Sequence, residues 1–447
     1  MKIFFVSLGC DKNLVDSEMM IGILADKGHT IIDDEKSADI IVVNTCCFIL
    51  DAKEESIETI LQMAELKETG SLKGLIVTGC LGERYREEIQ KEIPQVDSIL
   101  GTNSFDKIAE AIDEVVENRK QNYFVDINAA PVSGQKRFVT TGGHFAYLKI
   151  AEGCDKHCTY CIIPKIRGDF RSVPMETLLQ EAAMLAENGV KELILVAQET
   201  TVYGTDLYGE KKLPELLKKL AGIEGIQFIR LLYCYPEEIT EELVYVMRDE
   251  PKICHYLDMP IQHASDAVLK RMGRRTDSKQ LREVISLLRR EIPDICLRTT
   301  LITGFPGETR EDFKKLMAFV EEMRFDRLGV FPYSAEEGTA ATKLKGHLPQ
   351  FIKERRRDKV MRLQQRIAFE KAEEMVGEIL PVMIEGKLPE DGVFMGRTYK
   401  DAPNVDGMIF INSDRELITG DVITARVTES REYDLIGEIV NEDEFTK

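Results

Sequence analysis

The first 125 residues alternate short apolar runs with longer amphipathic segments. The apolar runs are KIFFVSLG (2–9), ADIIVVNT (38–45) and LKGLIVTG (72–79). Each run precedes a segment with helical periodicity, so the pattern predicts a doubly wound parallel α/β domain over residues 1–125. A cysteine follows each run directly, at Cys10, Cys46 and Cys80. Because the carboxyl ends of parallel strands lie at one edge of a sheet, we expect these cysteines to converge there.

Six further strand–helix units follow within residues 140–347. A polar stretch without helical period, 119–143, predicts a linker before them. Their strands are predicted at FAYLKIAEG (145–153), ELILVAQET (192–200), FIRLLYCYP (228–236), YLDMPIQH (256–263), CLRTTLITGF (296–305) and RLGVFPYS (327–334). Six units predict an open, partial (β/α)6 barrel of TIM type, whose functional residues should gather at the carboxyl ends of the strands.

The C-terminal part of the chain changes pattern twice. Residues 348–375 predict one long, charged amphipathic helix, and residues 376–447 alternate short strands with turn residues. The strands predict a small, five-stranded antiparallel β-barrel, OB-like and of the kind that holds macromolecules. The basic run KERRR (353–357) is interpreted as a charged helix face, with contact to RNA as the less favoured alternative.

Composition narrows the class of protein. The 447 residues are 43% hydrophobic, which is enough for two or three cores. The sequence contains no run of 18 apolar residues and no signal-peptide pattern, so we expect a cytoplasmic protein without a membrane partner. In that compartment ten cysteines are better explained as metal ligands or buried thiols than as disulfides.

The stretch EGCDKHCTYCIIP (152–164) holds three cysteines in a CxxxCxxC spacing, Cys154, Cys158 and Cys161. Thiolates are soft ligands that suit iron–sulfur clusters or zinc. Three cysteines leave one coordination position open, which favours a cluster. Zinc completed by His157 is the alternative, although His157 lacks the usual paired spacing. Other cysteines, Cys234, Cys254 and Cys296, lie in or beside strand patterns and are interpreted as core residues.

The CxxxCxxC motif, with Tyr160 before its last cysteine and at the end of the first barrel strand, resembles the radical S-adenosylmethionine superfamily. The resemblance implies a catalytic 4Fe-4S cluster on Cys154, Cys158 and Cys161. Its open iron would be chelated by the amino and carboxylate groups of S-adenosylmethionine. Reductive cleavage would then give a 5′-deoxyadenosyl radical.

Contacts to the cosubstrate follow only from the same resemblance. TTLITGFPGE (299–308) is similar to the fifth-strand motif along the adenine, with Thr300 and Gly307 where the commonest form has Gly and Glu. AQET (197–200) replaces the GGE that often follows the second strand. The implied cofactor-binding residues are Tyr160, Gln198, Arg298 and Gly304.

The domain order and several motifs resemble one family within this superfamily, the methylthiotransferases. SLGCDKNLVDSE (7–18), VNTCCFI (43–49), VTGCLGER (77–84) and DMPIQHASDAVLKRMGR (258–274) are similar to its RimO branch, whose C-terminal barrel is of TRAM type. The resemblance implies a second 4Fe-4S cluster on Cys10, Cys46 and Cys80, carrying sulfide or methylsulfide. Cys47, where the branch has a small residue, could exchange with Cys46.

The implied reaction methylthiolates the β-carbon of an aspartate in small-subunit ribosomal protein S-twelve, free or in the ribosome. It requires a reducing donor such as flavodoxin or ferredoxin. Methylthiolation of an adenosine in transfer RNA is the alternative, and a non-catalytic iron–sulfur carrier is a third that leaves the barrel unexplained. Residues 376–447 hold 16 Asp and Glu against 7 Lys and Arg, within a chain of net charge −19. This charge favours a basic protein over RNA as the substrate.

Overall fold

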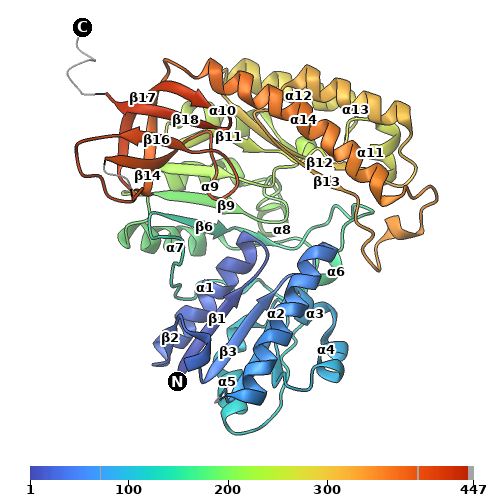
Figure 1. Ribbon diagram of the computed structural model, residues 1–447, viewed down its shortest axis with the longest axis vertical. Helices are drawn as coiled ribbons and strands as arrows, with labels where there is room; N and C mark the ends of the chain where they lie inside the picture. Colours follow the sequence, from blue (N-terminus) through green and yellow to red (C-terminus); the bar gives the residue numbers. More distant parts are fainter. Residues whose placement is uncertain (71, 390–391, 441–447) are drawn as a thin grey trace.

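The computed structural model describes residues 1–70, 72–389 and 392–440. The end of the predicted C-terminal region, 441–447, lies outside the described residues. Figure 1 shows the N-terminal α/β domain in blue below the central parallel sheet, with the C-terminal barrel in red against one side of that sheet. No helix within the described residues has both the length and the apolar character needed to cross a bilayer.

The N-terminal domain is a doubly wound sheet, as predicted. Within the described ranges its five strands are parallel, in the order β2-β1-β3-β4-β5. Alternate residues of β3 face opposite sides: Ile40 and Val42 join the core under α1 and α5, whereas Ile41 and Val43 join the core under α2. The elements are β1 (Lys2–Ser7), α1 (Asp11–Asp26), β2 (Thr30–Ile32), β3 (Ile40–Thr45), α2 (Leu50–Thr69), β4 (Gly74–Gly79), α3 (Cys80–Arg84), α4 (Arg86–Glu92), β5 (Ser98–Ile99) and α5 (Ile108–Val116).

The central domain is an open barrel of parallel strands. Over the described residues six strands pair in the order β13-β12-β11-β10-β9-β6, which confirms the partial barrel. Its strands are β6 (Phe145–Lys149), β9 (Glu192–Val196), β10 (Phe228–Leu231), β11 (Ile253–Asp258), β12 (Cys296–Thr303) and β13 (Arg327–Pro332), with a small pair β7 (Ala151–Glu152) and β8 (Arg171–Ser172). Its helices are α6 (Ile163–Ile166), α7 (Met175–Glu187), α8 (Thr205–Tyr208), α9 (Leu213–Ala221), α10 (Glu241–Asp249), α11 (Asp266–Met272), α12 (Ser278–Glu291) and α13 (Arg310–Met323).

The long helix α14 (Gln350–Glu374) packs along α13 and β13 and leads into the C-terminal barrel. That barrel comprises β14 (Ile379–Lys387), β15 (Val393–Thr398), β16 (Ile409–Asn412), β17 (Val422–Arg431) and β18 (Asp434–Ile439). In the described residues it closes in the order β14-β15-β16-β18-β17, and the pair β16–β18 is parallel. The expectation of a wholly antiparallel barrel is therefore wrong at this pair. A closed ring with an odd number of strands cannot alternate direction at every neighbour.

Buried ion pairs fix the C-terminal barrel to the central sheet. Glu192 on β9 accepts hydrogen bonds from Arg230 and from Arg397 of β15, each at 2.7 Å. Burial alone would raise the pKa of Glu192, but the two guanidinium groups lower it to about 2. Removing one partner of such a pair leaves an uncompensated buried charge, so the relative position of the two domains is strongly specified.

Candidate functional site

The three N-terminal cysteines converge at the carboxyl edge of their sheet. Cys10 precedes α1, Cys46 follows β3, and Cys80 is the first residue of α3. Gly9 has φ +89°, and a Cβ added to it would lie 2.9 Å from the Cys46 sulfur. The Cys80 sulfur lies 3.8 Å from Oδ1 of Asn13, on the first turn of α1. The carboxyl ends of β1, β3 and β4 lie side by side at one edge of the sheet, so the three cysteines predicted to converge do lie close together.

Cys46 and Cys47 point into different surroundings. Cys47 is fully buried in the apolar cluster that includes Ile162, and Arg84 donates to its carbonyl at 3.4 Å. Burial raises the pKa of Cys46, and its charged neighbours include Cys10 and Arg167. Cys46 thus faces Cys10 and Arg167, whereas the Cys47 thiol contacts Arg84; both thiols lie near Cys80.

The CxxxCxxC loop leaves β7 and ends at α6. Gly153, at φ +80°, begins it, and an added Cβ would lie 2.0 Å from the carbonyl oxygen of Asp169, so the loop requires glycine. Within the loop the Cys161 amide donates to the Cys158 carbonyl at 3.0 Å. Burial raises the pKa of Cys154 and Cys161 to about 12, so without a metal these thiols are protonated. Metal binding would therefore release protons here.

The donor sets of both triads fit an iron–sulfur cluster. Among the described residues, no three Cys, His, Asp or Glu side chains are gathered around the position of a single metal ion. A cubane cluster instead binds each thiolate through a different iron, which suits three cysteines spread around a larger group. His157 is exposed, with φ +49°, and so does not favour the zinc alternative.

Unpartnered acceptors lie beside this loop, after β9. The Gln198 amide donates to Glu152 at 2.7 Å, and its own oxygen is buried without a hydrogen-bond partner among the described residues. The Glu199 Oε2 is likewise buried without a hydrogen bond in the described structure, 3.7 Å from Nζ of Lys156. Burial raises the pKa of Glu199 to about 7. Such acceptors fit the amino group of S-adenosylmethionine.

A buried arginine on the same side was missed from the sequence. Arg274 stacks 4.3 Å from the ring centroid of Tyr235, whose hydroxyl lies 3.9 Å from the Cys158 sulfur. Its Nη2 donates to the Pro260 carbonyl at 3.0 Å, but Nε and Nη1 have no hydrogen-bond partner among the described residues. Nε and Nη1 lie on different edges of the guanidinium group, so each can donate a single hydrogen bond to an anionic group. Arg274 is the last residue of the motif 258–274, so this motif was the sequence feature from which its role could have been predicted.

The other residues predicted to bind cofactor lie in two places. Tyr160 packs edge-on against Phe305 beside the cysteine loop, with ring centroids 6.3 Å apart. Gly304 has φ +73°, and an added Cβ would lie 2.3 Å from Lys353 of α14. Arg298 pairs with Asp258 at 3.1 Å and with Asp406 at 3.6 Å, and lines a different cavity.

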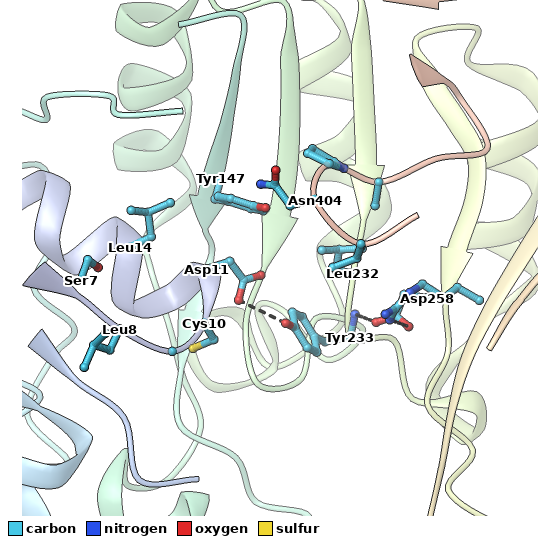
Figure 2. A pocket seen from close by; sticks show the side chains of 15 residues that line it. Ser7, Leu8, Cys10, Asp11, Leu14, Tyr147, Leu232, Tyr233, Asp258 and Asn404 are labelled. Atoms are coloured by element: carbon cyan, nitrogen blue, oxygen red, sulfur yellow. Dashed lines mark hydrogen bonds and ion pairs between the residues drawn. The ribbon is translucent and has the colours of Figure 1, made fainter. Parts of the chain in front are cut away.

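That cavity, of about 360 Å³, is lined by all three domains. Figure 2 shows Cys10 and Asp11 of the N-terminal domain opposite Tyr147 and Tyr233 of the barrel, with Asn404 of the C-terminal domain beside Tyr147. The Tyr233 hydroxyl donates to Asp11 at 3.1 Å, and the Tyr233 backbone adopts φ +61°. The cavity thus joins one N-terminal cysteine to the carboxyl ends of barrel strands.

A buried charge network connects the two triads. Arg167, from the RGDFRS segment (167–172), donates to Asp16 at 2.9 Å and to Glu152 at 3.1 Å. Lys149 binds the same two carboxylates. Although burial opposes it, Arg167 and Lys149 lower the pKa of Glu152 to about 2. Arg171 donates to the Arg167 carbonyl at 3.0 Å, so the two arginines are structural partners.

Comparison with known proteins agrees with this architecture. Three family models match: Uncharacterized protein family UPF0004 over residues 2–101, the Radical SAM superfamily over 148–320 and the TRAM domain over 376–440. The solved structure of the radical S-adenosylmethionine methyltransferase TsrM from Kitasatospora setae, with cobalamin and a 4Fe-4S cluster, aligns with a TM-score of 0.55 at 12% identity. The alignment covers 88% of this chain and 80% of that one, and shows a shared fold.

Curated relatives are more similar and match along the whole chain. A protein from Lachnoclostridium phytofermentans named ribosomal protein uS12 methylthiotransferase RimO is 63% identical over 98% of this chain and 99% of its own length. Proteins of the same name from Clostridioides difficile and Geobacter sulfurreducens are 49% and 48% identical, over 99% and 98% of this chain and 99% of each relative. Together with the three domains and the two cysteine triads, these matches show that the chain belongs to the RimO family of radical S-adenosylmethionine methylthiotransferases.

Proposed function

We propose that this protein attaches a methylthio group to the β-carbon of an aspartate in ribosomal protein uS12 (S-twelve). The names of its relatives support this substrate. The observation within this chain that carries the proposal is the cavity in which Cys10 faces the carboxyl ends of the barrel strands. A substrate side chain in that cavity would lie beside Cys10, near the carboxyl ends of β10 and β11.

The proposed ligands are Cys154, Cys158 and Cys161 for one cluster and Cys10, Cys46 and Cys80 for the other. When bound, the clusters and S-adenosylmethionine supply a strongly reducing electron, a 5′-deoxyadenosyl radical, and the sulfur and methyl group that are transferred. The two triads lie in different domains, so the chemistry is divided between them. We propose the boundaries 1–125 for the N-terminal domain, 140–347 for the partial barrel, 348–375 for the connecting helix and 376–447 for the C-terminal barrel.

Positioning of the cosubstrate is assigned to groups beside the cysteine loop. Glu199 and Gln198 would accept from its amino group, since both offer a buried oxygen without a hydrogen bond in the described structure. Arg274 would donate a single hydrogen bond from Nε or Nη1 to its carboxylate. Tyr160 and Gly304 would lie beside the adenine, where their packing against Phe305 and α14 leaves little freedom.

Arg298 is proposed to contact the substrate rather than the cosubstrate. It lines the cavity that contains Cys10, and its side chain is 24% exposed even though it pairs with Asp258. An arginine fixed in this way can offer its remaining N–H groups to the carboxylate of an incoming aspartate. The carboxylates already paired with it would hold its orientation.

Outside the site, charge supports a basic substrate. The acidic C-terminal barrel, which carries the cavity loop 402–405, complements a basic ribosomal protein. We propose that the protein works in the cytoplasm with a reducing donor of the flavodoxin or ferredoxin type. A small donor of this kind would have to deliver its electron near Cys154, Cys158 and Cys161.

The test uses enzyme with both clusters reconstituted without oxygen, a chemical reductant, sulfide and S-adenosylmethionine. Isolated uS12, small ribosomal subunits and transfer RNA are offered in parallel, and each is read by mass spectrometry. We expect a methylthio mass gain on an aspartate of uS12 and none on the RNA. A gain on the RNA alone would establish the alternative substrate. Formation of 5′-deoxyadenosine with no gain on the RNA, on isolated uS12 or on uS12 within the small subunit would contradict both substrates.

A further inference from the structure

The basic run KERRR (353–357) does not form one uniform charged face. Lys353 and Arg356 are buried at 8% and 9% exposure, whereas Arg355 is exposed. Lys353 covers Gly304 and donates to the Tyr333 carbonyl at 2.8 Å, and Arg356 donates to Glu308 at 2.6 Å. The buried Lys353 and Arg356 therefore fix α14 to the barrel. The exposed Arg355 makes no such contact and is accessible to a binding partner.

Arg355 lines a groove between α13 and α14, together with basic residues outside the run. The groove has a volume of about 530 Å³, and its charged lining residues are all basic: Arg310, Lys314, Arg355, Arg356 and Lys359. Phe313, Met317 and Ile352 supply its apolar wall. The two helices run side by side at the right of Figure 1. The chain has a net charge of −19, so a groove whose charged residues are all basic has the opposite charge to the average surface.

Most of these cations are uncommitted. In the described structure, Arg310, Arg355 and Lys359 make no ion pair or side-chain hydrogen bond. Lys314 pairs with Glu311 at 2.8 Å, but both side chains are more than 70% exposed, so this pair holds Lys314 only weakly. The nearby Glu354 accepts from Gln350 at 3.0 Å. Three free cations and one loosely held cation thus face a single groove.

An exposed aromatic side chain outside the groove lining, Phe351, lies in line with the cations of α14. Phe351, Arg355 and Lys359 are spaced by four residues, so they follow one another along one face of α14. Phe351 is 64% exposed, the largest exposure but one among the exposed large hydrophobic side chains of the described residues. A row of cations beside an exposed ring suits an RNA strand, whose phosphates take the cations and whose bases can stack on the ring.

The groove lies at the catalytic end of the barrel. Arg356 in its wall donates to Glu308, and Glu308 accepts from the backbone of Gly304 and Phe305, at the carboxyl end of β12. Phe305 in turn packs against Tyr160 of the cysteine loop. A macromolecule held in the groove would therefore reach the same end of the barrel as the two triads.

From these observations we propose that the groove between α13 and α14 binds the RNA backbone of the small ribosomal subunit, so that uS12 is modified while it is bound to RNA. The inference rests on the proposed function, because it needs uS12 as the substrate. It also refines the argument from charge: the acidic C-terminal barrel faces protein, and the basic groove faces the RNA around it. The RNA contact then positions the particle and carries no sequence information of its own.

The test compares two acceptors, isolated uS12 and purified small subunits that lack the modification. The charge-reversed variant R355E/K359E is compared with K27E/K218E, which makes the same change of charge at two exposed lysines on α9 and after α1. The assays use a chemical reductant and are repeated with a protein electron donor. With small subunits at about 0.1 M salt, we expect R355E/K359E to lose about tenfold or more in kcat/KM, and the salt dependence of log KM to become shallower by about 2. Phe351→Ala should lose several-fold on the same acceptor.

With isolated uS12, R355E/K359E should stay within about twofold of the wild type, and K27E/K218E should match it on both acceptors. Equal losses on both acceptors, or no loss on subunits, would overturn the proposal. A defect that appears only when a protein donor replaces the chemical reductant would instead assign the groove to an acidic protein. If the wild type modifies uS12 but never the subunit, this inference fails alone; if it modifies neither, the proposed function fails.

Discussion

At the scale of single residues, Cys158 and Cys80 belong to different triads, so replacing each should abolish a different step of the reaction. Cys158→Ala should abolish formation of 5′-deoxyadenosine, because the cluster that receives S-adenosylmethionine loses a ligand. Cys80→Ala should retain that activity and lose insertion of sulfur into uS12. The measurement is quantification of 5′-deoxyadenosine and of methylthio-uS12 in the same reaction. Equal loss of both products in both variants would refute the division of labour.

Glu199 gives the site a pH dependence. Burial raises its pKa to about 7, so the carboxyl is protonated below that pH and ionised above it. Only the ionised form accepts freely from the amino group of S-adenosylmethionine, so affinity should rise with pH. We expect the Kd of the cluster-loaded enzyme for S-adenosylmethionine to increase several-fold from about pH 7.5 to about pH 6. Glu199→Gln should bind more weakly at the higher pH and lose this dependence. A dependence that survives in the variant would assign the titration to another group.

At the scale of elements, regular patterns were readable from the sequence and contacts between distant elements were not. The cysteine after each parallel strand could be placed because strand ends share one edge, and the six barrel strands followed from their alternation with helices. The parallel pair β16–β18 could not, because it arises from closure of an odd-numbered ring. Arg274 was also missed, since its free N–H groups become evident only when Tyr235 and the cysteine loop are placed around it.

Charged runs show the same limit. In KERRR the sequence gives five polar residues on a helix, but the burial of Lys353 and Arg356 depends on which face of α14 meets the barrel. The argument from average charge likewise could not reveal the basic groove, because Arg310 comes from α13 and Arg355 from α14. Net charge predicts the mean field of a protein and not its local distribution.

The contact between α1 and the segment after α6 depends on Arg167. Replacing it with Met would leave Asp16 and Glu152 buried with less compensation, at a cost of about 3–5 kcal/mol. The matched control is Arg366→Met, whose exposed pair with Glu321 should contribute less than about 1 kcal/mol. Thermal unfolding, with hydrogen exchange across residues 2–26, measures the difference. If both variants lower stability equally, Arg167 is not the anchor of this interface.

At the scale of the whole molecule, the cavity is complete only because the C-terminal barrel sends a loop, 402–405, into the central domain. Asp406 holds that loop: it accepts from the Tyr256 hydroxyl at 2.8 Å and from the Ala402 amide at 2.9 Å. It also lies 3.6 Å from Nε of Arg298, and its side chain is only 3% exposed. One buried carboxylate therefore connects the C-terminal barrel to the wall of the proposed reaction cavity.

Asp406→Asn should loosen this connection without touching either triad. The amide keeps one acceptor but loses the charge that faces Arg298, so the loop and the guanidinium should shift relative to Cys10. Displacements of about 1 Å near reacting groups can cost up to about a hundredfold, and we expect methylthio transfer to fall by about ten- to a hundredfold. Cleavage of S-adenosylmethionine should continue, so the ratio of 5′-deoxyadenosine to methylthio-uS12 should rise. Asp414→Asn, at an exposed position of the same barrel, is the matched control and should leave the ratio unchanged. An unchanged ratio in Asp406→Asn would mean that the loop only covers the cavity and does not align the substrate within it.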